Sequence, residues 1–356
     1  MSHFACFFDV CVMCRAAVAA GLPDRVKIAP DLSGNQVATM SSSLTVAPRR
    51  EYQSFHDLPI VLDLDTIEAD VAILGIPYGA PYSMDDVTND QTNAPTHIRR
   101  YCDRALRSLE RWDFDLGGPL LDGKPIRVVD VGDVPGNPAD IGEHYRTAEA
   151  VVRKLLSRGV MPIVLGGDHG VPIPVFRALE GRGPITLVHV DAHLDWRDHV
   201  NGVREGLSSP IRRAAEMEHI HDIFQIGLRS AGSARPEEVE AALAYGSNLI
   251  TDMELQRIGM QAVLDRIPDG GTYYLTIDAD GVDPTIMPAV AGPAPGGVTY
   301  DQMRTLIHGL VDKGRVLGMD IVEITPKRDL NGITAVTAGR FICNLIGKAV
   351  RAGYFD

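Results

Sequence analysis

The sequence predicts an α/β fold, a three-layer α/β/α domain built on a mostly parallel sheet of eight strands. Two observations predict it. From about residue 68 onward, short apolar runs rich in β-branched residues alternate with longer stretches whose apolar positions recur three and four apart. The short runs are apolar at successive positions, which indicates strands that helices cover on both faces. A closed barrel of parallel strands fits the same pattern.

The expected strands are short and end beside glycine or polar residues, whereas the expected helices between them are longer. The expected strands are residues 71–74, 127–131, 161–165, 186–190, 223–226, 248–250, 273–277 and 316–321. The expected helices include residues 141–158, 171–179, 236–245 and 300–312. Helical crossovers make neighbouring strands parallel, so we expect the functional residues at the carboxyl ends of the strands.

The chain is expected to hold one catalytic domain. Residues 1–45 are expected to form a poorly ordered N-terminal extension, and residues 46–356 a single domain, since no internal repeat or long linker divides them. The Pro- and Gly-rich run 288–297 is expected to be a loop beside the site.

Charge restricts the class of partner. The 356 residues carry a formal net charge of −13, which argues against nucleic acid and anionic membranes and favours a small cationic substrate. The sequence contains no uninterrupted run of about eighteen apolar residues, so it predicts no membrane-spanning helix. The cytoplasm is therefore the expected location.

Residues of the kinds that bind metals gather at three strand ends. Residues two apart along an extended chain point the same way, so each motif is expected to present its side chains together. Four carboxylates without cations would repel one another, and two divalent ions would remove that repulsion. Mixed imidazole and carboxylate ligands suit manganese, nickel, iron or zinc better than calcium. The candidate ligands are His169, Asp191, His193, Asp195, Asp278 and Asp280.

At these residues the sequence resembles the ureohydrolase family of arginases and agmatinases, its agmatinase-like branch in particular. The resemblance covers residues 71–350. Four motifs carry it in the family's order: Gly-Gly-Asp-His at 166–169, Asp-Ala-His-Leu-Asp at 191–195, Asp-Ala-Asp-x-x-Asp-Pro at 278–284, and Glu-Ile-Thr-Pro at 323–326.

The resemblance implies a role for each motif residue. Asp191 and Asp278 would bridge two ions, with the other four ligands completing one ion each: His169 and Asp195 the first, His193 and Asp280 the second. Glu323 would hold the substrate guanidinium. Manganese is the expected metal, with nickel as the alternative. The expected assembly is a homo-oligomer, a trimer or hexamer, or a hetero-oligomer with a related subunit.

The implied activity is a hydrolase with a binuclear metal centre that cleaves a C–N bond of a guanidino compound. Water that loses its proton between two ions would attack the guanidinium carbon and release urea, or a substituted urea, and an amine. Within the family, guanidine or a biguanide such as metformin are alternative substrates. A single-zinc deacetylase of the arginase fold and an inactive scaffold subunit are the rival interpretations; the complete ligand set disfavours both.

Several residues near the motifs depart from the family pattern or flank it. Glu205 stands where many relatives have a proton-transferring histidine, so it is a candidate for proton transfer or for binding a cationic nitrogen. His199 is the alternative proton shuttle. Trp196 is a candidate for stacking on the substrate. Asn89 lies in the loop after the first strand and is expected to line the entrance.

Overall fold

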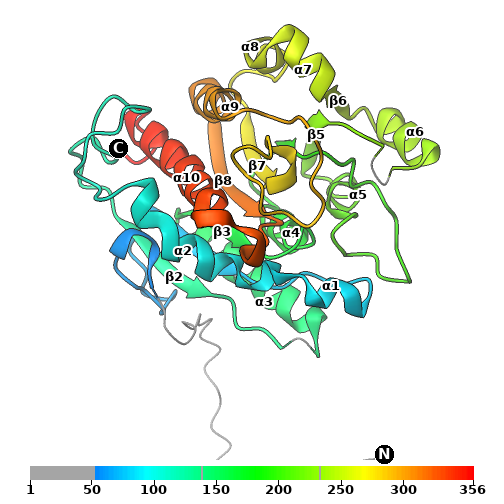
Figure 1. Ribbon diagram of the computed structural model, residues 1–356. Coiled ribbons are helices and arrows are strands. Elements are labelled where there is room, and N and C mark those ends of the chain that lie inside the picture. Colours follow the sequence, from blue (N-terminus) through cyan, green and yellow to red (C-terminus); the bar gives the residue numbers. More distant parts are fainter. Residues whose placement is uncertain (1–52, 138, 232–233) are drawn as a thin grey trace, which may run out of the picture. The chain divides into compact units, whose positions relative to one another are not determined.

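The computed structural model describes residues 53–137, 139–231 and 234–356, so the expected N-terminal extension lies outside the described residues. The described part contains one sheet of eight strands, in which all recorded strand pairs are parallel. The strand order is β2-β1-β3-β8-β7-β4-β5-β6. The predicted three-layer α/β fold is confirmed (Figure 1), and the edges at β2 and β6 exclude the closed barrel.

Each predicted strand overlaps an observed one. The largest difference is at β5, which begins at Ile220 instead of residue 223. The strands are β1 Val71–Ile76, β2 Val128–Asp133, β3 Met161–Gly166, β4 Ile185–Val190, β5 Ile220–Leu228, β6 Asn248–Thr251, β7 Thr272–Asp278 and β8 Arg315–Val322.

Some of the helices begin or end at capping residues that the sequence supplies. Asp140 accepts a hydrogen bond from the Glu143 backbone at the start of α3, and Gly246, with φ of 98°, ends α6. The predicted helices correspond to α3, α4, α6 and α9. The helices are α1 Met84–Thr88, α2 Ala94–Ala105, α3 Ile141–Ser157, α4 Pro172–Ala178, α5 Pro210–Ala214, α6 Pro236–Tyr245, α7 Asp252–Ile258, α8 Met260–Leu264, α9 Tyr300–Lys313 and α10 Ile333–Arg351.

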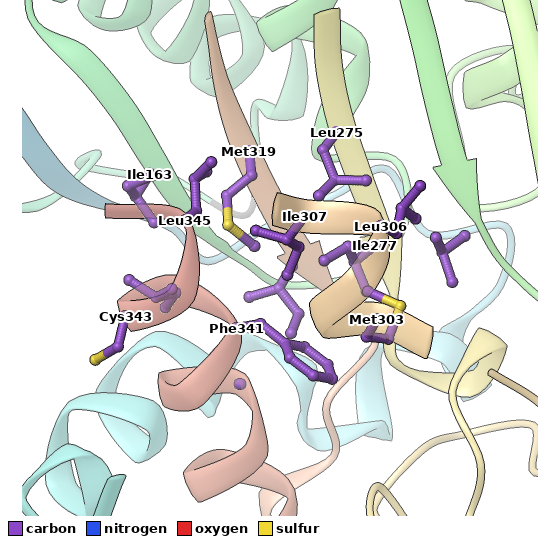
Figure 2. Close-up of a cluster of buried hydrophobic side chains, with 14 of the residues drawn as sticks. Ile163, Leu275, Ile277, Met303, Leu306, Ile307, Met319, Phe341, Cys343 and Leu345 are labelled. Atoms are coloured by element: carbon purple, nitrogen blue, oxygen red, sulfur yellow. The ribbon is translucent and has the colours of Figure 1, made fainter. Parts of the chain in front are cut away.

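Two hydrophobic clusters lie on opposite faces of the sheet because successive strand residues point to opposite sides. In β3, Ile163 and Leu165 belong to one cluster and Val164 to the other. Helices α2, α7, α8, α9 and α10 cover the first face, and α3, α4, α5 and α6 cover the second. Figure 2 shows the first face, where Phe341 of α10 and Leu306 of α9 pack beside the strands.

Helix α10 is long and apolar enough to cross a membrane by composition alone. However, 78% of its most apolar window is buried inside the fold. Its side chains pack against α2, α9 and the sheet, and each large apolar residue buried there contributes about 1.5–3 kcal/mol. Packing in the core therefore accounts for the apolar character of this helix.

A buried ion-pair network ties α2 to the edge strand β2. Arg99 is 1% exposed, and its guanidinium donates to Asp130 at 2.8 and 2.9 Å and to Asp133 at 2.6 Å. Asp130 also accepts from the Phe55 backbone at 2.8 Å. The network fixes the position of β2 and of the segment that precedes β1.

The strand order decides which loops meet. Strands β3, β8, β7 and β4 are consecutive in the sheet, and all are parallel, so their carboxyl ends lie side by side at one edge. The candidate ligands and Glu323 lie at or just after these four ends.

Candidate metal centre

One imidazole lies at the centre of the first group of candidate ligands. His169 follows β3, and its Nδ1 atom lies 3.1 Å from Asp191 Oδ2, 3.0 Å from Asp195 Oδ2 and 3.0 Å from Asp278 Oδ2. These side chains come from the ends of three strands and are all buried. The structure thus brings together four of the six predicted ligands around one point.

The other two predicted ligands form an adjacent group that shares Asp191. His193 Nδ1 lies 3.4 Å from Asp191 Oδ1 and 3.2 Å from Asp280 Oδ2. Asp191 directs one oxygen toward each group. Its carboxylate is therefore placed between two neighbouring cation positions.

Turns, and not extended strands, position these side chains. Asp191 Oδ1 accepts from the His193 backbone at 2.6 Å, and Asp278 Oδ1 accepts from the Asp280 backbone at 2.8 Å. Residues Ala279–Gly281 form a 3₁₀ turn, and Asp195 has φ of 50°. The expectation that residues two apart point the same way along an extended chain is therefore wrong, because the aspartates bond to the backbone two residues on and turn the chain.

The electrostatics of the cluster fit the binding of cations. Burial raises the pKa of Asp278 well above its usual range, and the neighbouring Asp280 and Asp191 raise it further. The Nε2 atom of His169 is buried without a hydrogen-bond partner, and His169 Nδ1 and Asp195 Oδ2, although 3.0 Å apart, are not aligned for a hydrogen bond. Buried carboxylates and unpartnered imidazole nitrogens that face one another are the donor set that divalent transition metals prefer.

A residue that the sequence reasoning missed supports Asp191 from within the sheet. His189 of β4 is fully buried and donates from Nε2 to Asp191 Oδ2 at 2.8 Å. In the sheet, His189 is the register partner of Thr276 in β7, and Thr276 is the register partner of Asp320 in β8. The Thr276 hydroxyl donates a hydrogen bond to Asp320 Oδ1 at 2.6 Å. Partners behind a metal ligand orient that ligand. The signal was the position of His189, two residues before Asp191 on a buried strand.

Glu323 reaches the same edge from the end of β8. Its backbone has φ of 64°, and its Oε1 atom accepts from the His169 backbone at 2.8 Å. Its Oε2 atom accepts from Gln91 Nε2 at 3.0 Å. Burial raises the pKa of Glu323 to about 8, with a further contribution from Asp168. Gln91 was missed by the sequence reasoning because a single amide in a loop carries no distinctive pattern.

The remaining candidates have partners outside the ligand cluster. The Glu205 carboxylate forms an ion pair with Arg177 of α4. The Trp196 indole is buried against the ring of Tyr245, with centroids 5.7 Å apart. The structure therefore does not bring Glu205 or Trp196 to the predicted ligands.

The recorded contacts of His199 and Asn89 also do not involve the candidate ligands. The His199 side chain is 61% exposed and lies 3.3 Å from Asp198. Asn89 ends α1, where its backbone N–H donates to Asp86.

The Pro- and Gly-rich loop lies beside the cluster, as predicted. A Cβ atom on Gly292 would lie 3.8 Å from both Asp280 Oδ2 and His193 Cε1. Arg229 attaches this loop to the ligand turn, because it donates to Ala294 O at 3.1 Å and to Gly281 O at 3.1 Å. Residues from β5, β7 and the loop are thus held together at the rim of the centre.

Comparisons with known proteins agree with this geometry. A sequence model described as "Arginase family" matches residues 69–347, which is more than half of the chain. Guanidinopropionase of Pseudomonas aeruginosa is 34% identical over 237 residues, 64% of this chain and 74% of that protein. Guanidinobutyrase of the same organism is 28% identical over 326 residues, 88% of this chain and 95% of that protein.

A solved structure shows the same fold. Proclavaminate amidino hydrolase from Streptomyces clavuligerus matches with a TM-score of 0.73 and 27% identity, covering 84% of this chain and 97% of that one. The family match spans all six predicted ligands and Glu323. This chain belongs to the arginase family, and it is a hydrolase that acts on C–N bonds other than peptide bonds.

Proposed function

We propose that this protein is a binuclear-metal amidinohydrolase that cleaves a C–N bond of a small cationic guanidino compound, giving urea or a substituted urea and an amine. The observation that carries the proposal is the meeting of two imidazoles and four carboxylates in two groups that share Asp191. A hydrolase with a single cation would need only one of these groups.

In this proposal each cation has its own set of side chains. Asp191 and Asp278 would serve both ions, His169 and Asp195 would complete one site, and His193 and Asp280 would complete the other. Manganese is the proposed metal, with nickel as the alternative. When bound, such ions lower the pKa of water to near neutrality and polarise the bond under attack.

The protein's own residues bind and orient the substrate. Glu323 is the carboxylate that pairs with the guanidinium, and Gln91 holds one of its oxygens while the His169 backbone holds the other. His189 keeps Asp191 oriented toward both groups. Because these partners are buried, the reacting groups need little rearrangement when substrate binds.

Two further expectations accompany the activity. The protein acts in the cytoplasm, and it assembles as a trimer or hexamer of identical chains, or with a related subunit. Guanidine and metformin are alternative substrates, because they share the planar carbon that the centre would attack. They are included in the urea-release experiment described next.

Metal content and urea release test the proposal together. We expect about two ions per chain by elemental analysis after loading with manganese or nickel, and urea release from at least one guanidino compound. Asp191→Asn should lower metal content and abolish urea release, because this carboxylate serves both groups. Asp222→Asn, the same change at an exposed position of β5, is the control and should alter neither. A single tightly bound ion with hydrolysis of acetyl-lysine would replace the proposal with the deacetylase.

A further inference from the structure

A cavity opens beside the predicted metal centre, beyond the side chains assigned to it. It has a volume of about 490 Å³ and lies between the ends of β5 and β6 and the starts of α6 and α7. Its described walls are mainly apolar, and they include Leu194, Leu228, Val239, Leu249 and Met253. Met253 is 81% exposed, so the cavity meets solvent at this residue.

The wall of the cavity and the ligand cluster share one residue. His193 lines the cavity and also faces Asp191 and Asp280 in the second ligand group. Its side chain is 27% exposed, whereas the side chains of Asp191 and Asp280 are 0% and 6% exposed. A substrate that reaches the centre on this side therefore has its substituent beside apolar walls.

The two charged side chains of the cavity wall, apart from His193, do not offer a net charge to a substrate. They are Arg229 and Asp252, whose formal charges cancel. The Arg229 guanidinium donates to backbone carbonyls of Gly281, Ala294 and Pro295, among others. The Asp252 carboxylate accepts from Gln256 Nε2 at 2.9 Å. In the described lining, the cationic side chain of Arg229 is therefore engaged by backbone carbonyls and is not available to pair with a substrate carboxylate.

We propose that this cavity binds an uncharged alkyl substituent of the guanidino substrate, so that the enzyme prefers N-alkylguanidines to guanidino acids of equal length. The inference rests on the proposed amidinohydrolase function and specifies its substrate class. Apolar walls stabilise a hydrocarbon chain in proportion to the area removed from water. A carboxylate in the same place would lose hydration without gaining a partner.

The length of the alkyl substituent and the charge of its end group determine the expected changes in kcat/KM. Each methylene group buried in the cavity should raise kcat/KM about fourfold, until the chain reaches solvent at Met253. Exchanging the terminal methyl for a carboxylate should lower kcat/KM at least about tenfold, because the carboxylate is partly desolvated beside apolar side chains.

The first test compares matched substrates on the metal-loaded protein. Urea release is measured with ethyl-, propyl-, butyl- and pentylguanidine and with 4-guanidinobutyrate. Calorimetric titration with the product amines, butylamine and 4-aminobutyrate, gives a readout independent of turnover. We expect activity to rise along the alkyl series and butylamine to bind at least about tenfold more tightly.

The outcomes separate the inference from the function it rests on. Equal or better activity with 4-guanidinobutyrate overturns the inference while the amidinohydrolase function stands. If no guanidino compound releases urea from protein that holds two ions, the proposed function fails, and the inference fails with it.

A charge-insertion variant tests the location. Met253→Lys places a cation at the mouth of the cavity, where exposure of 81% makes misfolding unexpected. It should raise kcat/KM for 4-guanidinobutyrate about two- to fivefold, the range for a solvent-exposed ion pair, and lower that for butylguanidine. Leu243→Lys, at another position that is 58% exposed and outside the cavity, is the matched control. Equal effects of the two changes would show that general surface charge, and not this cavity, selects the substrate.

Discussion

Replacing Glu323 by glutamine probes the proposed guanidinium site with little change in shape. The substitution keeps the side-chain volume and replaces an ionisable carboxyl by a neutral amide at a buried position, where Oε1 lies 2.8 Å from the His169 backbone nitrogen and Oε2 lies 3.0 Å from Gln91 Nε2. A hydrogen bond to a charged group contributes about 1.5–3 kcal/mol, which corresponds to about 10- to 150-fold in kcat/KM. We expect a loss in this range, with a raised KM and a lowered kcat.

The assay is steady-state urea release, with metal content measured on the same samples. Glu323→Gln should retain about two ions per chain, because Glu323 is not a proposed ligand. Glu149→Gln is the control, since Glu149 pairs with Arg153 on the surface of α3 at 2.9 Å. Unchanged kcat/KM for Glu323→Gln would remove Glu323 from the site. A loss of metal together with activity would show that it acts through the ions instead.

A double-mutant cycle tests whether Gln91 acts through Glu323. Gln91→Leu removes the donor to Glu323 Oε2 and should lower kcat/KM about 2- to 10-fold, the range for one net hydrogen bond. In the Glu323→Gln background the same change should have less than half of this free-energy effect, because the charge that Gln91 orients is gone. Fully additive effects would show that the two residues act independently.

Three other predictions concern stability and the framework of the centre. Arg99→Met should lower the free energy of unfolding by about 3–5 kcal/mol in urea titrations, since it removes the guanidinium that donates to the buried carboxylates of Asp130 and Asp133; a loss below about 1 kcal/mol would contradict this. Burial lowers the pKa of His56 from 6.5 to about 4, so the unfolded chain takes up the proton first and stability is lost as pH falls below 6.5. Between pH 7 and 5 the wild type should lose about 2 kcal/mol more than His56→Gln, and parallel curves would refute the burial argument. Gly281→Ala would place Cβ 2.5 Å from the Asp191 backbone and should reduce metal content, whereas Gly292→Ala, with a nearest contact of 3.8 Å, should not.

The fold and the proximity of the candidate ligands were predictable because each depends on pattern and chain direction. Apolar runs at successive positions indicated buried parallel strands, and parallel strands bring their carboxyl ends to one edge. His169, Asp191 and Asp278 therefore had to lie near one another once β3, β4 and β7 were central in the sheet. The predicted helices did not include α10, most of whose residues are buried in the core.

The environment of the ligands was not predictable, because it depends on single side chains brought together from distant positions. His189 and Gln91 have the same appearance in the sequence as any buried histidine or loop amide. Glu205 forms an ion pair with Arg177, which is distant in the sequence, so this pairing could not be predicted. The sequence showed only that Glu205 follows the Asp-Ala-His-Leu-Asp motif, and this position suggested a role near the centre. The turns at Asp191 and Asp278 depend on local hydrogen bonds that strand periodicity does not report.

In the proposed enzyme, metal binding and substrate choice would depend on different parts of the fold. The proposed ligands lie at the ends of central strands, where buried partners such as His189 hold them and few substitutions fit. The cavity lies at the ends of β5 and β6, close to the sheet edge, where Met253 is exposed. Substitutions in the cavity can therefore change which guanidino compound binds without changing metal content or melting temperature. Substitutions of the proposed ligands, unlike Glu323→Gln, should alter the metal content, the stability and the activity together, because the same carboxylates serve all three.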